Sequence, residues 1–193
     1  MKNNNTRYIC EGALIAVLYI VLTYISALFN LSSGVIQLRL SEALCILPMF
    51  TPAAIPGLAI GCLLSNLFTG SIIIDIIFGS IATLIGAIFT RLLRRHTIAA
   101  LLSPVLSNTI IIPIILKYAY HAEDAYWFMT ITVFAGEFIS AGILGYILRR
   151  ALKARRLNKL FPDSDVQLNK NYNTILSLSR QLSIRRQLTH YIS

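Results

Sequence analysis

Three stretches of almost uninterrupted apolar residues constrain this chain more than any other feature. They run from about residue 10 to 29, 98 to 117 and 126 to 148. Each is close to the roughly 20 helical residues that cross a hydrocarbon core about 30 Å thick. A soluble domain of 193 residues could not bury such runs in a chain that is 56% hydrophobic and only 13% charged. The sequence therefore predicts an all-α, polytopic membrane protein.

Three further segments complete the predicted membrane region. The stretches 53–69 and 72–90 are slightly short but almost wholly apolar, and the polar break between them leaves room only for a tight turn. The segment 38–51 is less regular, because proline removes an intrahelical hydrogen bond and three prolines lie in or just after it, Pro48, Pro52 and Pro56. We therefore expect six transmembrane helices, of which the second is short or broken.

The positions of the basic residues predict the orientation, since cytoplasmic loops are enriched in Lys and Arg. With six spans and a cytoplasmic N-terminus, fifteen of the seventeen basic residues fall on the cytoplasmic side, and only Arg39 and Lys117 do not. Five spans would put the cluster at 91–95 and the cluster after Leu148 on opposite faces. Both termini are therefore expected in the cytoplasm.

The net charge of +9 follows from the same topology. Basic residues beside anionic lipid headgroups explain it without nucleic-acid binding, so membrane lipids are expected partners and nucleic acid is not. The expected organisation is a membrane-embedded part, 1–150, and a basic cytoplasmic tail, 151–193, that is partly disordered.

The sequence contains no motif typical of a metal site, a nucleotide-binding site or a hydrolase. The three cysteines and three histidines have no metal-ligand spacing, so no metal site is expected. Nucleotide-binding loops and hydrolase motifs are also missing, and no cofactor or enzymatic activity is predicted. Transport driven by ATP would therefore need another subunit to hydrolyse the nucleotide.

Four ionisable residues in or beside the apolar segments mark the predicted functional region: Arg39, Glu42, Asp75 and Glu137. A charge at mid-helix costs about 2.5–3.5 kcal/mol on insertion scales, so such residues usually face a bundle interior, a partner or a polar ligand. Glu137 is the first candidate, because it lies about ten residues, or roughly 15 Å, into the last span.

The other three charged residues leave two interpretations open. Arg39 and Glu42 are spaced as an i, i+3 ion pair that would hold an outer loop, but they could equally line the mouth of a pocket. Asp75 begins its helix, where it could stabilise the helix N-terminus or receive a cationic group of a ligand.

Uncharged candidates carry similar alternatives. Asn66 and Asn108 can each donate and accept hydrogen bonds, which suits a heterocycle edge, yet intramembrane amides also join helices. Trp127 lies at the predicted outer boundary with neighbouring tyrosines, where aromatic belts are expected without any ligand. Stacking of Trp127 on a base is the functional alternative.

Three motifs together resemble one transporter family. They are IQLRLSEALCILPMFTPAAIPGLAIGCLLSN at 36–66, SIIIDIIFGSIATLIGA at 71–87 and AGEFIS at 135–140. In order and spacing they resemble the QueT family, the substrate-binding subunits, or S components, of energy-coupling factor (ECF) transporters associated with queuosine precursors. The resemblance covers roughly residues 10–150.

The resemblance implies a six-helix protein in the plasma membrane of a prokaryote. Such a protein would capture a scarce solute from outside and dock on a transmembrane coupling subunit driven by two ATPase subunits. The implied ligand is a 7-deazaguanine base such as a queuosine precursor. A guanine-like base has adjacent N–H donors that suit a bidentate pair with the carboxylate of Glu137 or Glu42.

The first span carries a possible docking face. Gly12 and Ala16 form a small-xxx-small pattern, and Ala13 adds a neighbouring small residue. Members of this transporter class dock through small residues of this helix, so the resemblance implies docking here, whereas packing within the bundle is the alternative. The main rival function is a self-sufficient proton-coupled carrier in which Glu137 would load and unload a proton.

Overall fold

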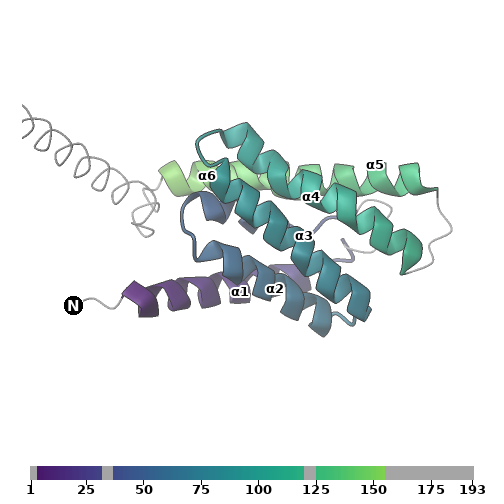
Figure 1. Ribbon diagram of the computed structural model, residues 1–193, viewed down its shortest axis with the longest axis horizontal. Coiled ribbons are helices and arrows are strands. Elements are labelled where there is room, and N and C mark those ends of the chain that lie inside the picture. The colour runs from purple at the N-terminus through teal and green to yellow at the C-terminus, as the bar shows by residue number, and fades with distance from the viewer. Residues whose placement is uncertain (1–3, 32–36, 120–124, 155–193) are drawn as a thin grey trace, which may run out of the picture.

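The computed structural model describes residues 4–31, 37–119 and 125–154, and every regular element in these ranges is helical. Figure 1 shows α1 and α2 along one side of the bundle, α5 and α6 along the other, and α3 and α4 between them. The elements are α1 (Asn4–Leu28), η1 (Leu40–Met49), α2 (Ala54–Phe68), α3 (Ile73–Leu92), α4 (Thr97–Tyr118), α5 (Tyr126–Glu137), η2 (Phe138–Leu144) and α6 (Gly145–Ala154).

Within the described ranges, four helices are long and apolar enough to cross a membrane: Asn5–Leu28, Ile73–Leu92, Thr97–Tyr118 and the continuous helix Tyr126–Ala154 formed by α5, η2 and α6. The predicted all-α membrane fold is thus confirmed, and each expected segment coincides with a helix. Most of the predicted cytoplasmic tail lies outside the described residues.

The segment expected to be a short or broken span is η1, a 3₁₀-helix of ten residues. At about 2.0 Å per residue it extends roughly 20 Å, which is less than a hydrocarbon core of about 30 Å. Its residues from Ser41 to Met49 are buried except Ala43. It packs against α1, α2, α3, α4, α6 and η2, so η1 forms the centre of the bundle.

Small residues let α1 and α2 pack backbone to backbone. A Cβ atom on Gly57 would lie 2.6 Å from the carbonyl oxygen of Gly12, and one on Gly61 would lie 3.1 Å from the Cα of Ala16. Gly12 and Ala16 are both buried at this contact. The small-xxx-small pattern of the first span is therefore occupied by packing within the chain.

Proline and glycine shape the contact between α3 and α4. Pro104 lies inside α4 and lacks the N–H that would bond the carbonyl of Ala100. The hydroxyl of Thr90 on α3 donates to that carbonyl instead, at 3.1 Å. A Cβ on Gly86 would lie 2.8 Å from the Cα of Pro104, so glycine permits this close approach.

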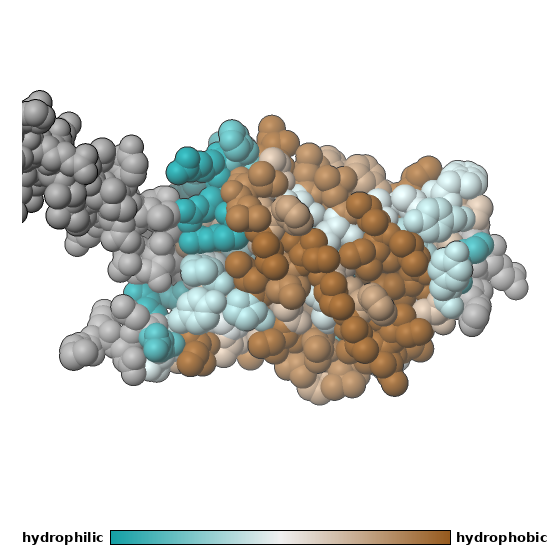
Figure 2. Space-filling view, viewed as in Figure 1, coloured by the Kyte–Doolittle hydropathy of each residue, from teal (hydrophilic) through white to brown (hydrophobic). Residues whose placement is uncertain are grey.

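The surface matches a lipid environment over most of its length. Figure 2 shows a broad hydrophobic face across the middle of the bundle, with hydrophilic atoms gathered at the end where α1 begins and α6 ends. Large apolar side chains such as Ile73, Ile98 and Ile110 are exposed on the helices. Together with the four long helices, this identifies a multi-pass membrane protein.

Candidate functional site

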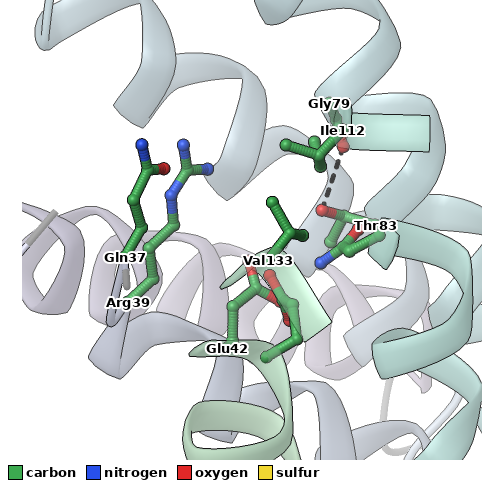
Figure 3. Close-up of a pocket in the computed structure, with 9 residues that line it drawn as sticks. Gln37, Arg39, Glu42, Gly79, Thr83, Ile112 and Val133 are labelled. Carbon is green, nitrogen blue, oxygen red and sulfur yellow. Dashed lines mark hydrogen bonds between the residues drawn. The ribbon is translucent and has the colours of Figure 1, made fainter. Parts of the chain in front are cut away.

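A polar cavity lies between η1, α3, α4 and α5, in the part of the bundle away from the N-terminus. The space between atoms there is about 390 Å³, a volume that includes the part open to solvent. Figure 3 shows side chains from separate segments turned toward it. The lining residues are Gln37, Arg39, Glu42, Gly79, Thr83, Asn108, Ile112, Val133 and Glu137.

Glu137, the last residue of α5, contributes a buried carboxyl group that is 9% exposed. Within the described part of the chain, its Oε2 atom has no hydrogen-bond partner. The π-helix η2 begins at the next residue. π-Helical turns are rare in proteins, and those that occur are often found at functional sites. A buried acceptor facing a cavity is suited to a ligand that brings its own donors.

Glu42 is the second carboxyl group of the cavity and is only 1% exposed. Its Oε1 accepts a hydrogen bond from the hydroxyl of Tyr19 on α1, and its Oε2 accepts one from the thiol of Cys45 at 3.1 Å. Both oxygens are therefore held by the protein. Glu42 is a fixed acidic group, whereas Glu137 retains an acceptor that is available to a ligand.

Arg39 and Gln37 enter the cavity from the segment before η1. Figure 3 shows their side chains extending in the same direction, as alternate residues of an extended segment do. Arg39 has extended backbone angles, φ −111° and ψ 106°. Of the two interpretations left open for Arg39 and Glu42, the i, i+3 ion pair is not seen among the described residues, whereas both residues line the cavity.

The opposite wall comes from α3 and α4. Asn108 is 3% exposed, and its Oδ1 accepts no hydrogen bond from the residues that the structure describes. Thr83 donates to the carbonyl of Gly79, one turn earlier on α3, at 3.1 Å. Ile112 and Val133 supply apolar surface between these polar groups, which is the usual composition of a site for a small heterocycle.

Asp75 and Asn66 form a second layer behind Gly79. A Cβ on Gly79 would lie 3.3 Å from Oδ1 of Asp75 and 3.2 Å from Nδ2 of Asn66. Both side chains are buried, at 6% and 2% exposure, but neither lines the cavity directly. The absence of a side chain at Gly79 is what brings them close to the cavity wall.

A known transporter family is similar to this chain. The profile of a family described as QueT transporter matches residues 9–154, which is most of the chain. The chain belongs to the QueT transporter family. That match covers every element that lines the cavity.

One curated relative is the queuosine precursor transporter QueT of Lactococcus lactis subsp. cremoris (strain MG1363), which is 38% identical over 85 residues. The aligned region is 44% of this chain and spans only half of the relative's length. No solved structure matches the chain.

Among the residues predicted as binding groups in this QueT family member, the structure brings Arg39, Glu42, Asn108 and Glu137 together around one cavity. It does not bring Trp127 to that cavity. Trp127 is 66% exposed and makes an edge-to-face contact with Phe128. This placement fits the aromatic-belt interpretation, because an amphipathic ring at the end of a span is expected at the membrane interface.

The three predicted docking residues of this QueT family member do not share one surface of α1. Gly12 and Ala16 face α2, as described above, whereas Ala13 is exposed. Leu14 and Val17 are exposed beside Ala13 on the outward surface of α1. Of the three small residues, only Ala13 therefore lies on the outward surface of α1.

Sequence reasoning missed several residues of the site. Gln37 lies two positions before Arg39, and Thr83 lies within an apolar helix, so each is a polar residue in an apolar setting that could have been noticed. Tyr19 and Cys45 gave no such signal. Their role depends on their contact with the Glu42 carboxyl group, and spacing along the chain does not reveal that contact.

Proposed function

We propose that this protein captures a queuosine precursor or a related 7-deazaguanine base and takes part in its uptake across the plasma membrane of a prokaryote. Membership of the QueT transporter family and the name of the Lactococcus relative, a queuosine precursor transporter, support the ligand class. The polar cavity inside an apolar bundle supports binding of a small polar solute. The protein carries out no bond chemistry in this proposal.

The observation that carries the proposal is the Oε2 atom of Glu137, a buried acceptor without a protein donor in the described residues. A guanine-like base presents adjacent N–H groups that a carboxylate can accept in pairs. Asn108 Oδ1 is a further acceptor in the same cavity, and the guanidinium of Arg39 is a donor for a carbonyl oxygen. The cavity thus offers complementary groups for the polar edge of such a base.

The proposed topology has six membrane segments, with η1 as the short second one, and both termini in the cytoplasm. The basic residues of the sequence support this orientation. Gln37 and Arg39 follow the end of α1, and Gly79 lies in the second turn of α3. In this orientation the cavity lies in the half of the bundle that faces the outside of the cell.

The proposed source of energy is an ECF module, composed of a transmembrane coupling subunit and two ATPase subunits. The sequence supports this division of labour, because it contains no phosphate-binding loop. The exposed surface of α1 around Ala13 is the proposed contact with the coupling subunit. Small side chains permit close helix contacts in membranes, where packing drives association.

A proton-coupled carrier is the second candidate, and one observation favours it. Glu42 and Glu137 line the same buried cavity, and two acidic groups in one site can share a proton. In this alternative the protein works without ATPase subunits. Uptake that persists after loss of the ATPase subunits but stops when the proton gradient is collapsed would identify the carrier.

The direct test is binding of 7-deazaguanine bases to the purified protein in detergent. We expect submicromolar binding by calorimetry, and native mass spectrometry of the protein with its co-purified ligand would give the mass of the solute. Absence of any deazaguanine binding, together with a co-purified solute of another class, would exclude the proposed ligand.

A further inference from the structure

The segment Gln37–Arg39 lies against the junction of α5 and η2, far away in the sequence. The carbonyl oxygen of Gln37 lies against Gly136, and the backbone N–H of Arg39 donates to Oγ of Ser140 at 3.2 Å. These two contacts fix the ends of a three-residue segment whose side chains at Gln37 and Arg39 line the cavity. The N–H of Leu38, between them, donates to the carbonyl of Leu31 at 2.8 Å, so the last helix and the end of α1 together place both side chains.

Gly136 allows the closer of the two contacts. A Cβ atom at this position would lie 2.2 Å from the carbonyl oxygen of Gln37 and 3.1 Å from its carbonyl carbon. Both are backbone atoms, which cannot move aside as the end of a flexible side chain can. Any side chain at position 136 would therefore push the segment away from the helix.

Ser140 provides the second contact, four residues after Gly136 on the same side of the helix. It is 1% exposed, and its hydroxyl accepts the N–H of Arg39. Glu137 lies between the two anchoring residues. The same short stretch of helix thus presents the acidic group of the cavity and positions the side chains of Gln37 and Arg39.

We propose that Gln37 is a ligand-contacting residue, and that Gly136 and Ser140 are positioning residues that hold Gln37 and Arg39 at the cavity. The amide of Gln37 offers a donor and an acceptor to the edge of a heterocycle. The ligand contact rests on the proposed function, whereas the positioning of the segment does not depend on the identity of the ligand.

The positioning is tested first without ligand, by the rate at which a thiol reagent labels Gln37→Cys. The background carries Cys10→Ser, because Cys10 is exposed whereas Cys45 and Cys62 are buried. Position 37 is half-buried, so adding Gly136→Ala is expected to raise the labelling rate several-fold, since displacement of the segment exposes the thiol further. Gly142→Ala is the matched control, because a Cβ there lies at an ordinary 3.5 Å from Phe138. Equal rates in the two alanine variants would overturn the inference.

Ser140→Ala tests the second contact and covers the case in which Gly136→Ala does not fold. The labelling rate at position 37 is expected to rise several-fold, because the N–H of Arg39 loses its acceptor. Ser80→Ala is the control, a buried serine whose hydroxyl bonds the carbonyl of Ile76 in its own helix. A labelling rate in Ser140→Ala equal to that of the control would also overturn the positioning role.

The ligand contact is tested with 7-deazaguanine as the probe. Gln37→Ala is expected to weaken its binding about fivefold or more, the loss of one hydrogen bond or two, with an unchanged melting temperature. Unchanged affinity in Gln37→Ala would remove Gln37 from the ligand site. If the parent protein binds no deazaguanine, the proposed function fails, while the labelling experiment still decides the positioning role.

Discussion

The hydroxyl of Tyr19 donates a hydrogen bond to Oε1 of Glu42 and thereby joins the first helix to the wall of the cavity. Tyr19 is 1% exposed and faces inward from α1, between Ala16 and Thr23. The hydroxyl of Thr23 in turn donates to Oγ of Ser41 at 2.8 Å. Ser41 is the residue before Glu42 in the sequence. These hydrogen bonds form a polar connection from α1 to η1 inside the bundle.

Replacement of Tyr19 by Phe is predicted to destabilise the protein by about 1–3 kcal/mol, because Oε1 of Glu42 would remain buried without this donor. Thermal unfolding in detergent measures the change. Tyr24→Phe is the control, since Tyr24 is on the same helix but 55% exposed. Equal melting temperatures for the two variants would contradict the structural role of this hydrogen bond.

Replacement of Glu137 by Gln is predicted to weaken binding of a 7-deazaguanine by about 1 kcal/mol or more, which is roughly fivefold in Kd. The amide keeps the size of the side chain but replaces one acceptor by a donor. Calorimetric titration provides the measurement. Glu11→Gln serves as control, because Glu11 bonds Arg7 and Thr51 and is not part of the cavity. Unchanged affinity in Glu137→Gln would exclude this carboxyl group from the site.

Replacement of Gly57 by Ala is predicted to cost about 1–3 kcal/mol, typical of overpacking, since the new Cβ would lie 2.6 Å from the backbone oxygen of Gly12. Gly142→Ala is the control, because its new Cβ would lie at an ordinary 3.5 Å from the ring of Phe138. The melting temperature is the measurement. A loss of stability no larger than that of Gly142→Ala would contradict the prediction, because it would mean that α1 and α2 can move apart to accept the new Cβ at no energetic cost.

Thr90 and Pro104 are predicted to be energetically coupled. Thr90→Val should cost about 1–2 kcal/mol, because the carbonyl of Ala100 loses its donor while remaining buried in the bundle. In a Pro104→Ala background the new N–H of residue 104 can bond that carbonyl, so the same substitution should cost less. A double-mutant cycle of unfolding free energies measures the difference, and strict additivity would contradict the coupling.

The helices could largely be predicted from the sequence. Polar residues are costly in lipid, so membrane-spanning helices consist of long apolar runs that are easy to recognise. The expected stretch 98–117 and the observed α4, Thr97–Tyr118, differ by a single residue at each end. Segment 38–51 was harder to predict. Pro48 within it and two prolines after it indicated an irregular helix, but its 3₁₀ geometry and central position depend on packing against the other helices.

The cavity could be predicted only in part. Ionisable residues inside apolar segments indicated Glu42 and Glu137, since an unpaired charge in lipid is too costly to be accidental. Gln37 could have been noticed as a polar residue near Arg39, but its contact with Gly136, about a hundred residues later, could not be predicted. Trp127 was considered because of its position at the predicted outer boundary, and its exposed ring agrees with the aromatic-belt interpretation and not with stacking in the cavity.

The contact of Gln37 with Gly136 also has a consequence for biosynthesis. The ribosome completes α1, η1, α2, α3 and α4 before it synthesises Gly136, Glu137 and Ser140. Until then the Gln37–Arg39 segment lacks its contacts with Gly136 and Ser140, although the N–H of Leu38 can already bond the carbonyl of Leu31. A nascent chain halted before the last helix would already be inserted in the bilayer, yet it would lack an assembled binding chamber.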